Sequence, residues 1–336
     1  MNVEKYIFEV EKLDLFCNFL RKHYDEDNRI ENHIKRITEQ INEENPFYEF
    51  GTIQNFLLLE SDQVIGHCSA IIDKRNKNTG LIGFYDCIDD EDASKLLLSK
   101  AVAWLKKHNC IKIEGPVNLT IWHNYRFIIS HKRAPAIFDP VNKDYYPKQW
   151  KNFGFSASGK YVSAIRQDFN HVIPLTKHAF EELSEVGLFI REFEKNNFIA
   201  ELEILRKLAN KIFQNSWNFV ELSQTEFSSL YNKVIPLIDG KFIEIIEDKN
   251  NEPVGFCFSM PNPSVHSQVI MKTIGVIPEL QRSGIGAAML YSQHKKAQEQ
   301  NFKEFYYPLI RVGNNVTKLP YEGYEIITEY QTYMLN

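Results

Sequence analysis

The sequence predicts two α/β lobes, each built on a mixed, mainly antiparallel central sheet that is flanked by helices. Three observations lead to this prediction. The chain has 336 residues, 43% of them hydrophobic, which is enough for two domains with cores of their own. Strand and helix signals recur in the same order in both halves, and landmark residues repeat at a nearly constant spacing.

The first half begins with two apolar strands that flank a short polar turn, and this pattern predicts a β-hairpin. A third apolar strand, an amphipathic helix and a short closing strand follow. These elements are expected at residues 55–60, 64–72, 81–87, 91–107 and 111–114.

The second half repeats this order: a hairpin, a strand, a Gly-containing loop, a helix and a short strand. The strands are expected at residues 242–247, 254–259, 269–276 and 305–307, and the helix ends near Gln300. The landmarks that repeat are Gly66 and Gly255, shifted by 189, with Asn109 and Asn301 and then Pro116 and Pro308, each shifted by 192. Such an offset favours duplication of one fold over chance likeness.

Further helices are expected at residues 24–43, 177–195, 199–213 and 227–238, from the spacing of their apolar residues. The last two occupy the places where the first helices of the second lobe should fall. We therefore expect an N-terminal lobe over residues 1–172 and a C-terminal lobe over residues 173–336.

Composition narrows the class of protein. The formal net charge is −5 and no basic stripe is present, so we expect no nucleic-acid partner. No apolar run is long enough to span a membrane, and the charged start does not match a signal peptide. Five cysteines without a C-x-x-C pair indicate reduced thiols and a cytoplasmic setting. No His, Cys or carboxylate cluster has metal-ligand spacing, so no metal is expected.

The stretch from Thr273 to Leu290, TIGVIPELQRSGIGAAML, contains the strongest chemical signal. A strand ends at Val276, and the segment Gln281-Arg282-Ser283-Gly284-Ile285-Gly286-Ala287 leads directly into a helix. A helix N-terminus presents unpaired N–H groups at its positive end, and glycines allow close approach of a ligand. This arrangement is suited to binding a diphosphate, although an ordinary tight turn would have a similar pattern.

This stretch resembles the acyl-CoA-binding loop of the GNAT superfamily, Q/R-x-x-G-x-G/A, with Gln281, Gly284 and Gly286 in the matching places. The resemblance implies a cofactor site formed by Gln281 to Ala287. It also implies that the backbone of Ile274, Gly275 and Val276 holds the pantetheine arm and polarises the thioester. Asn314 or Asn315 matches an Asn that the family places in a short helix.

Several first-half stretches extend the resemblance to a bacterial, two-lobed (tandem) GNAT type without an assigned substrate, over about residues 30–335. These stretches are Asn45-Pro46-Phe47, Gly83-Phe84-Tyr85-Asp86-Cys87, Gly115-Pro116-Val117-Asn118, Tyr145-Tyr146-Pro147 and Gly154-Phe155. At the place of the CoA loop, however, the first half carries Ile88-Asp89-Asp90-Glu91-Asp92-Ala93. Four carboxylates suit a helix start but repel a diphosphate, so the first lobe should not bind CoA.

Catalytic residues are harder to assign. Where the family has a Tyr acid, the matching place holds Leu319, and Tyr321 is the nearest substitute; Tyr306 and Tyr307 are alternatives. Glu244, inside an apolar strand, is the candidate base, although a solvated edge carboxylate is the commoner situation. Lys272 is either an acceptor-site lysine or a surface one.

The polar and aromatic stretch after Gly115-Pro116 is a natural ligand contact, with Asn118, His123 and Arg126 as candidate acceptor-binding residues. A structured surface loop is the plain alternative. The resemblance implies an N-acyltransferase that moves an acetyl or other short acyl group from acyl-CoA to an amine acceptor between the lobes. The alternative is a non-catalytic CoA-binding or sensor protein.

Overall fold

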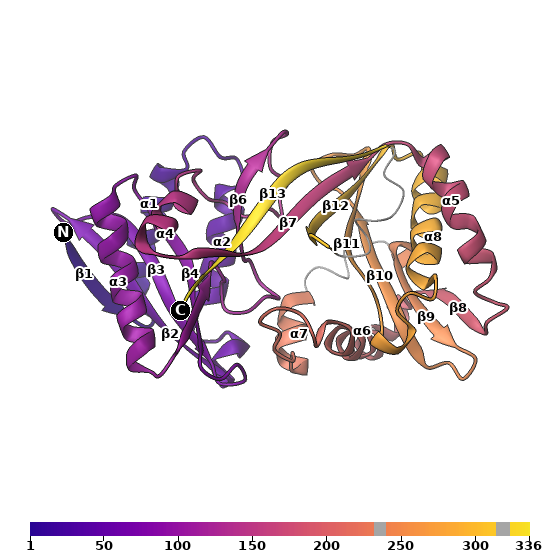
Figure 1. Ribbon diagram of the computed structural model, residues 1–336, viewed down its shortest axis with the longest axis horizontal. Coiled ribbons are helices and arrows are strands. Elements are labelled where there is room, and N and C mark those ends of the chain that lie inside the picture. The colour runs from indigo at the N-terminus through magenta and orange to yellow at the C-terminus, as the bar shows by residue number, and fades with distance from the viewer. Residues whose placement is uncertain (232–239, 314–322) are drawn as a thin grey trace. The chain divides into compact units, whose positions relative to one another are not determined.

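The computed structural model describes residues 1–231, 240–313 and 323–336, which form two compact units (Figure 1). Unit 1 comprises residues 1–160, 218–220 and 329–336, and unit 2 comprises the remaining described residues from 161 to 328. The last eight residues, 329–336, thus belong to unit 1, whereas a single division at residue 172 assigns them to the C-terminal lobe. Both chain ends therefore lie in unit 1.

Unit 1 holds most of the elements in the first half of the chain. They are β1 (Asn2–Tyr6), α1 (Val10–His23), α2 (Ile30–Ile41), η1 (Pro46–Glu49), β2 (Gly51–Glu60), β3 (Gln63–Asp73), β4 (Thr79–Cys87), α3 (Glu91–Lys107), β5 (Lys112–Gly115), β6 (Phe127–His131) and α4 (Tyr146–Phe153). Two long strands, β7 (Ser156–Arg166) and β13 (Tyr324–Leu335), each contribute one part to unit 1 and one part to unit 2.

Unit 2 holds the remaining elements. They are α5 (Phe169–Glu181), β8 (Leu188–Glu192), η2 (Lys195–Asn197), α6 (Phe198–Phe213), α7 (Gln224–Tyr231), η4 (Gly240–Phe242), β9 (Ile243–Asp248), β10 (Pro253–Pro261), β11 (Gln268–Val276), η5 (Pro278–Leu280), α8 (Ile285–Glu299) and β12 (Glu304–Arg311).

The strand order in unit 1 is β1-β2-β3-β4-β5-β13-β7, with β6 also paired to β13. All the recorded pairings are antiparallel except β4 with β5. In unit 2 the order is β7-β12-β11-β10-β9-β8, and only β11 with β12 is parallel. Each unit is therefore a mixed, mainly antiparallel sheet with helices, and the predicted fold class is confirmed.

Helices cover both faces of the unit 1 sheet. Phe16 of α1 stacks on His67 of β3, with ring centroids 3.9 Å apart. The next residue, Cys68, contacts Leu97 of α3. Because neighbouring side chains on a strand point to opposite faces, α1 and α3 lie on opposite sides of the sheet. Asp90 caps α3 by accepting a hydrogen bond from the Ala93 N–H at 2.7 Å, which is the helix-start role expected for these acids.

The end of the chain completes the unit 1 core. β13 pairs with β5, with Tyr333 opposite Gly115. The Tyr333 ring is 1% exposed and packs against Trp150 and Phe127. Large aromatic rings bury much apolar area, so this contact is a major anchor of the strand.

Two helix predictions were wrong in part. Residues 24–29 form a turn between α1 and α2, so the helix expected at 24–43 begins only at Ile30. The helix expected at 177–195 ends at Glu181, and Leu188–Glu192 is the edge strand β8 paired to β9. Strand pairing decided the conformation of this short segment, which periodicity alone does not settle.

Replacing Tyr333 by Ala should destabilise unit 1 by about 3 kcal/mol, because the change removes a fully buried ring from a packed core. The measurements are denaturant unfolding and hydrogen exchange, and exchange should accelerate in peptides that cover β5. Phe180→Ala is the matched control, since Phe180 of α5 is 37% exposed. Equal stability of wild type and Tyr333→Ala would contradict this account of the core.

Candidate functional site

In unit 2 the two parallel strands at the centre of the sheet separate. The pairing of β11 with β12 covers Gln268 to Ile270 opposite Glu304 to Tyr306. β11 then continues to Val276 along β10, with Val276 opposite Gly255. The far end of β11 is thus paired on one side, and its other edge faces the gap between the strands.

Strand alternation determines which backbone groups face this gap. Ile277 donates its N–H to the Val254 carbonyl at 2.9 Å, so Ile277 points toward β10. In an antiparallel ladder such residues alternate with residues that point away. Gly275 therefore points toward β10, whereas the N–H groups of Ile274 and Val276 point into the gap.

Gly275 is needed for a packing reason that sequence analysis missed. A Cβ atom at this position would lie 2.6 Å from Cγ2 of Ile212 in α6. That separation is closer than real Cβ contacts, so a side chain at position 275 would force Ile212 or α6 away from β11. Helix α6 in turn packs on β10 and β11 and supports this end of the strand.

The loop after β11 is short and internally braced. Gln281 donates from Nε2 to the Val276 carbonyl at 3.3 Å, and Ser283 donates from Oγ to the Leu280 carbonyl at 2.6 Å. Arg282 and Gly284 have positive φ angles of 69° and 86°. The turn is therefore left-handed where it enters α8, which is the backbone reason for glycine at position 284.

The first amides of α8 point out of the loop. The first backbone bond of the helix runs from Ala288 N–H to the Gly284 carbonyl, and no side chain caps the helix. Within residues 1–231, 240–313 and 323–336, no acceptor is recorded for the N–H groups of Ile285, Gly286 and Ala287. A Cβ at Gly286 would meet nothing within 4 Å. The positive end of the helix is thus open to an anion.

The matching place in unit 1 is closed by the chain itself. There β4 pairs with β5 from Thr79 to Leu81 before the strands separate. Val117 then donates its N–H to the Ile82 carbonyl at 2.9 Å, and the Asn118 side chain accepts from the Phe84 N–H at 2.8 Å. A Cβ at Gly83 would lie 2.0 Å from the Val117 carbonyl oxygen. The Ile82 carbonyl and the Phe84 N–H of β4 are therefore already bonded to the segment that follows β5.

Glu244 is buried beneath α8. Lys296 lies 2.9 Å from its Oε1, and Ser292 donates a hydrogen bond to the same oxygen. A carboxylate that is held by a cation and a hydroxyl is engaged in packing α8 on the sheet. This arrangement gives no support to a role as a free base.

The tyrosines of β12 point to different faces. Tyr307 forms a hydrogen bond with His294 of α8, and its ring stacks on Phe305. Burial lowers the pKa of His294 to about 3, so its ring is neutral at ordinary pH. Tyr306 is 1% exposed on the other face. Tyr321 and Asn314 lie outside the described residues.

Lys272 is exposed at the outer half of β11. Its Nζ lies 5.2 Å from the ring centroid of Tyr231 and 5.8 Å from that of Phe258. These distances are typical of cation–π contacts, so the side chain is held over α7 and β10.

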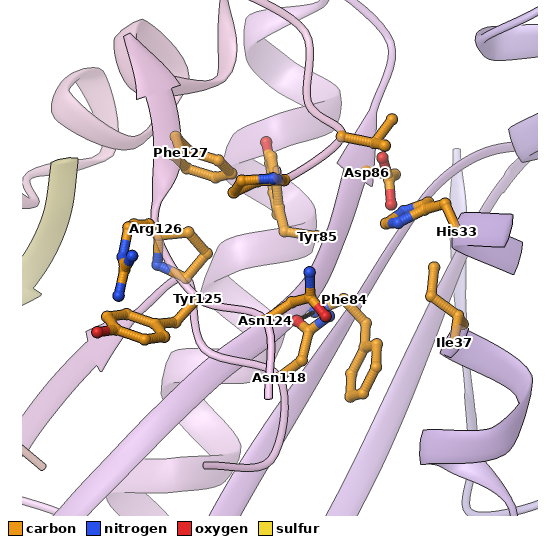
Figure 2. Close-up of a pocket in the computed structure, with 13 residues that line it drawn as sticks. His33, Ile37, Phe84, Tyr85, Asp86, Asn118, Asn124, Tyr125, Arg126 and Phe127 are labelled. Carbon is orange, nitrogen blue, oxygen red and sulfur yellow. Dashed lines mark hydrogen bonds between the residues drawn. The ribbon is translucent and has the colours of Figure 1, made fainter. Parts of the chain in front are cut away.

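Asn118 and Arg126 of unit 1 line one cavity, which also contains Asn124 and Asp86 (Figure 2). The Arg126 guanidinium lies 3.5 Å from the ring centroid of Tyr125. His123 does not line the cavity; its Nδ1 forms a 3.0 Å hydrogen bond with Thr120 Oγ1, and desolvation lowers its pKa to about 4. The structure thus brings together two of the three predicted acceptor residues.

Sequence analysis missed Asp86, which is 2% exposed near the end of β4. Tyr24 and Tyr146 donate hydrogen bonds to its Oδ1 at 2.6 and 3.2 Å. Burial raises its pKa from 3.8 to about 7, although these hydrogen bonds act in the opposite direction. The available signal was a single carboxylate inside the apolar strand LIGFYDC.

A second cavity lies in unit 2 between α6 and α7. It is lined by Ile199, Leu202, Glu203, Arg206, Gln224, Phe227 and Ser228. None of the residues predicted for the site lines it.

Three further findings concern the residues that the structure describes. These residues contain no group of three or more His, Cys, Asp or Glu side chains that could hold a metal ion. Among the described helices, none combines the length and apolar character needed to cross a bilayer. All five cysteines are free and buried.

No family model matches the chain. Among curated proteins it is 26% identical to protein YghO of Escherichia coli over 67% of this chain and 59% of that protein. It is 22% identical to the bacterial ceramide synthase of Caulobacter vibrioides, over 65% of this chain and 58% of that protein. The chain thus spans about three-fifths of the length of these two relatives.

Solved structures resemble the chain over nearly its whole length. A tandem GNAT protein from the clavulanic acid biosynthesis pathway matches 99% of this chain and 98% of its own, with a TM-score of 0.58 and 9% identity. The chain has the tandem GNAT fold. A GCN5-related N-acetyltransferase from Sphaerobacter thermophilus is also similar to the chain, with a TM-score of 0.57, 10% identity and coverage of 99% and 95% of the two chains. A fungal glucosamine N-acetyltransferase region also matches, with a TM-score of 0.61, 11% identity, 99% of this chain and 38% of that chain.

Asp86→Asn should stabilise the protein more at pH 7.5 than at pH 5. The folded-state pKa of Asp86 exceeds its ordinary value, so stability is highest when the group is protonated and falls as pH rises from about 4 to about 7. Thermal melts of wild type, Asp86→Asn and the exposed control Asp89→Asn at both pH values measure the change in melting temperature that each substitution causes. A gain for Asp86→Asn that does not grow with pH would contradict the assignment.

Proposed function

We propose that the chain is an acyl-CoA-dependent N-acyltransferase whose unit 2 binds the acyl-CoA. The observation that carries this proposal is the contrast between the two units. In unit 1, Val117 and Asn118 bridge the gap between the central parallel strands, whereas no such bridge to the far end of β11 is recorded among the described residues of unit 2. One acyl-CoA per chain follows from this contrast.

In this proposal the diphosphate lies on the loop from Gln281 to Ala287. The amides of Ile285, Gly286 and Ala287 donate to it along the helix dipole. Arg282 is exposed beside them and adds a positive charge. The absence of a Cβ at Gly284 and Gly286 leaves the backbone accessible.

The pantetheine arm lies along the free edge of β11, where the N–H groups of Ile274 and Val276 face the gap. One of these donors also polarises the thioester carbonyl and stabilises the oxyanion that forms during attack. Gly275 contributes by letting α6 pack behind the strand. The donor site is therefore made mainly of backbone, which explains why so few side chains identify it.

The acceptor in this proposal is a primary amine. Its neutral nitrogen attacks the thioester carbon, the carbon–sulfur bond breaks, and an amide and the CoA thiol are formed. Names among the similar proteins describe transfer to an amino group, including glucosamine N-acetyltransferase and ceramide synthase, a ceramide being the amide of a long-chain amino alcohol. Acyl groups from acetyl to long-chain are therefore candidate donors.

For acceptor binding we propose Asn118 and Arg126, which line the unit 1 cavity, with His123 in the loop beside them. Tyr321 as the acid and Asn314 as a cofactor contact stay predictions. Glu244 as the base also stays a prediction: Lys296 and Ser292 contact its Oε1, and its Oε2 is buried without a hydrogen-bond partner among the described residues.

Acetyl-CoA and palmitoyl-CoA titrated into the protein should test the donor site. Ser283→Glu places a negative charge beside the expected diphosphate and should weaken binding at least tenfold, or about 1.4 kcal/mol. Isothermal titration calorimetry measures the affinity and the stoichiometry, which should be one per chain.

The matched control is Gln300→Glu, which adds the same charge at the other end of α8. Unchanged affinity in Ser283→Glu, or no binding of either thioester to the wild type at millimolar concentration, would reject the proposed site. Release of free thiol with a panel of primary amines then separates a transferase from a protein that only binds CoA.

A further inference from the structure

A buried carboxylate faces the cavity of unit 1. Asp86 comes from the outer end of β4, and Figure 2 shows it beside His33, with Arg126 and Tyr125 across the cavity. The cavity volume is about 40 Å³, which is room for a small group rather than a nucleotide.

Only one oxygen of Asp86 is used by the protein. Tyr24 and Tyr146 both donate to Oδ1, and Tyr146 is itself fixed by a 3.0 Å hydrogen bond to His23. In the part of the chain that the structure describes, no donor to Oδ2 is recorded. The carboxylate is thus oriented through one oxygen, and the other remains available to a ligand.

No lysine or arginine among the described residues forms an ion pair with Asp86. Lys143 is a nearby cation, but its Nζ lies over the Tyr24 ring, 5.0 Å from the centroid. The Arg126 guanidinium lies against Tyr125. A buried carboxylate without a counter-ion is costly, and a bound cation would remove that cost.

Apart from Arg126, which stacks on Tyr125, the rest of the cavity wall is aromatic or neutral and suits a small cation. Phe84, Tyr85 and Phe127 supply aromatic surface, and aromatic faces attract ammonium groups. Asn124 adds a polar group to the lining. Within the described ranges, no hydrogen-bond partner of its side chain is recorded. An anion would instead meet the carboxylate of Asp86 at close range.

We propose that this cavity binds the amino group of a primary amine as an ammonium ion, with Asp86 as its counter-ion. The proposal that an amine binds here depends only on the lining of the cavity and on the contacts of Asp86. That this amine is the acceptor of acyl transfer rests on the function proposed above, and in that role the ammonium first gives one proton to the Asp86 carboxylate, so that its neutral nitrogen can attack the thioester.

Binding should strengthen between pH 6 and pH 8. Burial raises the pKa of Asp86 to about 7, so the carboxylate becomes charged across this range, whereas an alkylamine remains protonated. The neighbouring groups do not change charge there: the pKa of His33 is lowered to about 3, and those of Tyr24 and Tyr146 are raised well above 10. Lys143 and Arg126 are the cations that also face this region.

The test uses n-butylamine and n-butanol as probes, with the full chain and without acyl-CoA, observed by ligand-detected NMR at pH 8. Wild type should bind the amine and not the alcohol. Asp86→Asn should weaken amine binding at least tenfold, and Asp89→Asn, an exposed carboxylate in the following loop, should leave it unchanged. Asn124→Phe, which fills the cavity and leaves the Asp86 hydrogen bonds intact, should also weaken it.

Equal binding of butylamine to wild type and Asp86→Asn, or equal binding of butanol and butylamine, would overturn the proposal. Ser283→Glu separates this proposal from the previous one, because it should lose acyl-CoA binding and retain amine binding. A wild type that binds butylamine but no acyl-CoA would support the ammonium site and reject the transferase. A wild type that binds acyl-CoA but no butylamine would reject the ammonium site and leave the proposed acyl-CoA site supported.

Discussion

Each sheet contains one parallel pair of strands that stays in register for three positions and then separates. Backbone N–H groups at such a separation need partners, because a buried and unpaired donor is costly. In unit 1 the Asn118 side chain accepts from the Phe84 N–H, and Val117 donates its own N–H to the Ile82 carbonyl. In unit 2, no described residue pairs with the far edge of β11 beyond Ile270, and no side chain caps the N-terminus of α8 beside it. The difference in proposed roles follows from this one difference in backbone pairing.

Closing the gap in unit 1 also shapes its cavity. The segment that fills the gap contains Asn118, Asn124 and Arg126, and β4 carries Asp86 opposite them. Residues at the place that matches the proposed pantetheine site of unit 2 thereby form the wall of a small cavity. Two units with the same strand order thus differ in how the gap between their parallel strands is treated, and this difference underlies the two binding sites that we propose.

The sequence predicted what depends on local pattern. Strand β11, the turn at Gly284 and helix α8 are all encoded by nearby residues, and their placement agrees with expectation. Asp86 could not be recognised in this way, because Tyr24 and Tyr146 are 62 and 60 residues away from it. Glu244 has the same local pattern, a carboxylate in an apolar strand, yet its environment is a lysine beneath a helix. Only tertiary packing separates these two carboxylates.

Strand β13 has a consequence for biosynthesis. Residues 329–335 lie in unit 1, where Tyr333 packs on Trp150 and pairs opposite Gly115. While the ribosome is still translating unit 2, the nascent N-terminal half therefore has an unprotected strand edge at β5. It cannot reach its final packing until these last residues emerge from the exit tunnel. We expect chaperones that cover exposed strand edges to engage this half of the nascent chain during that interval.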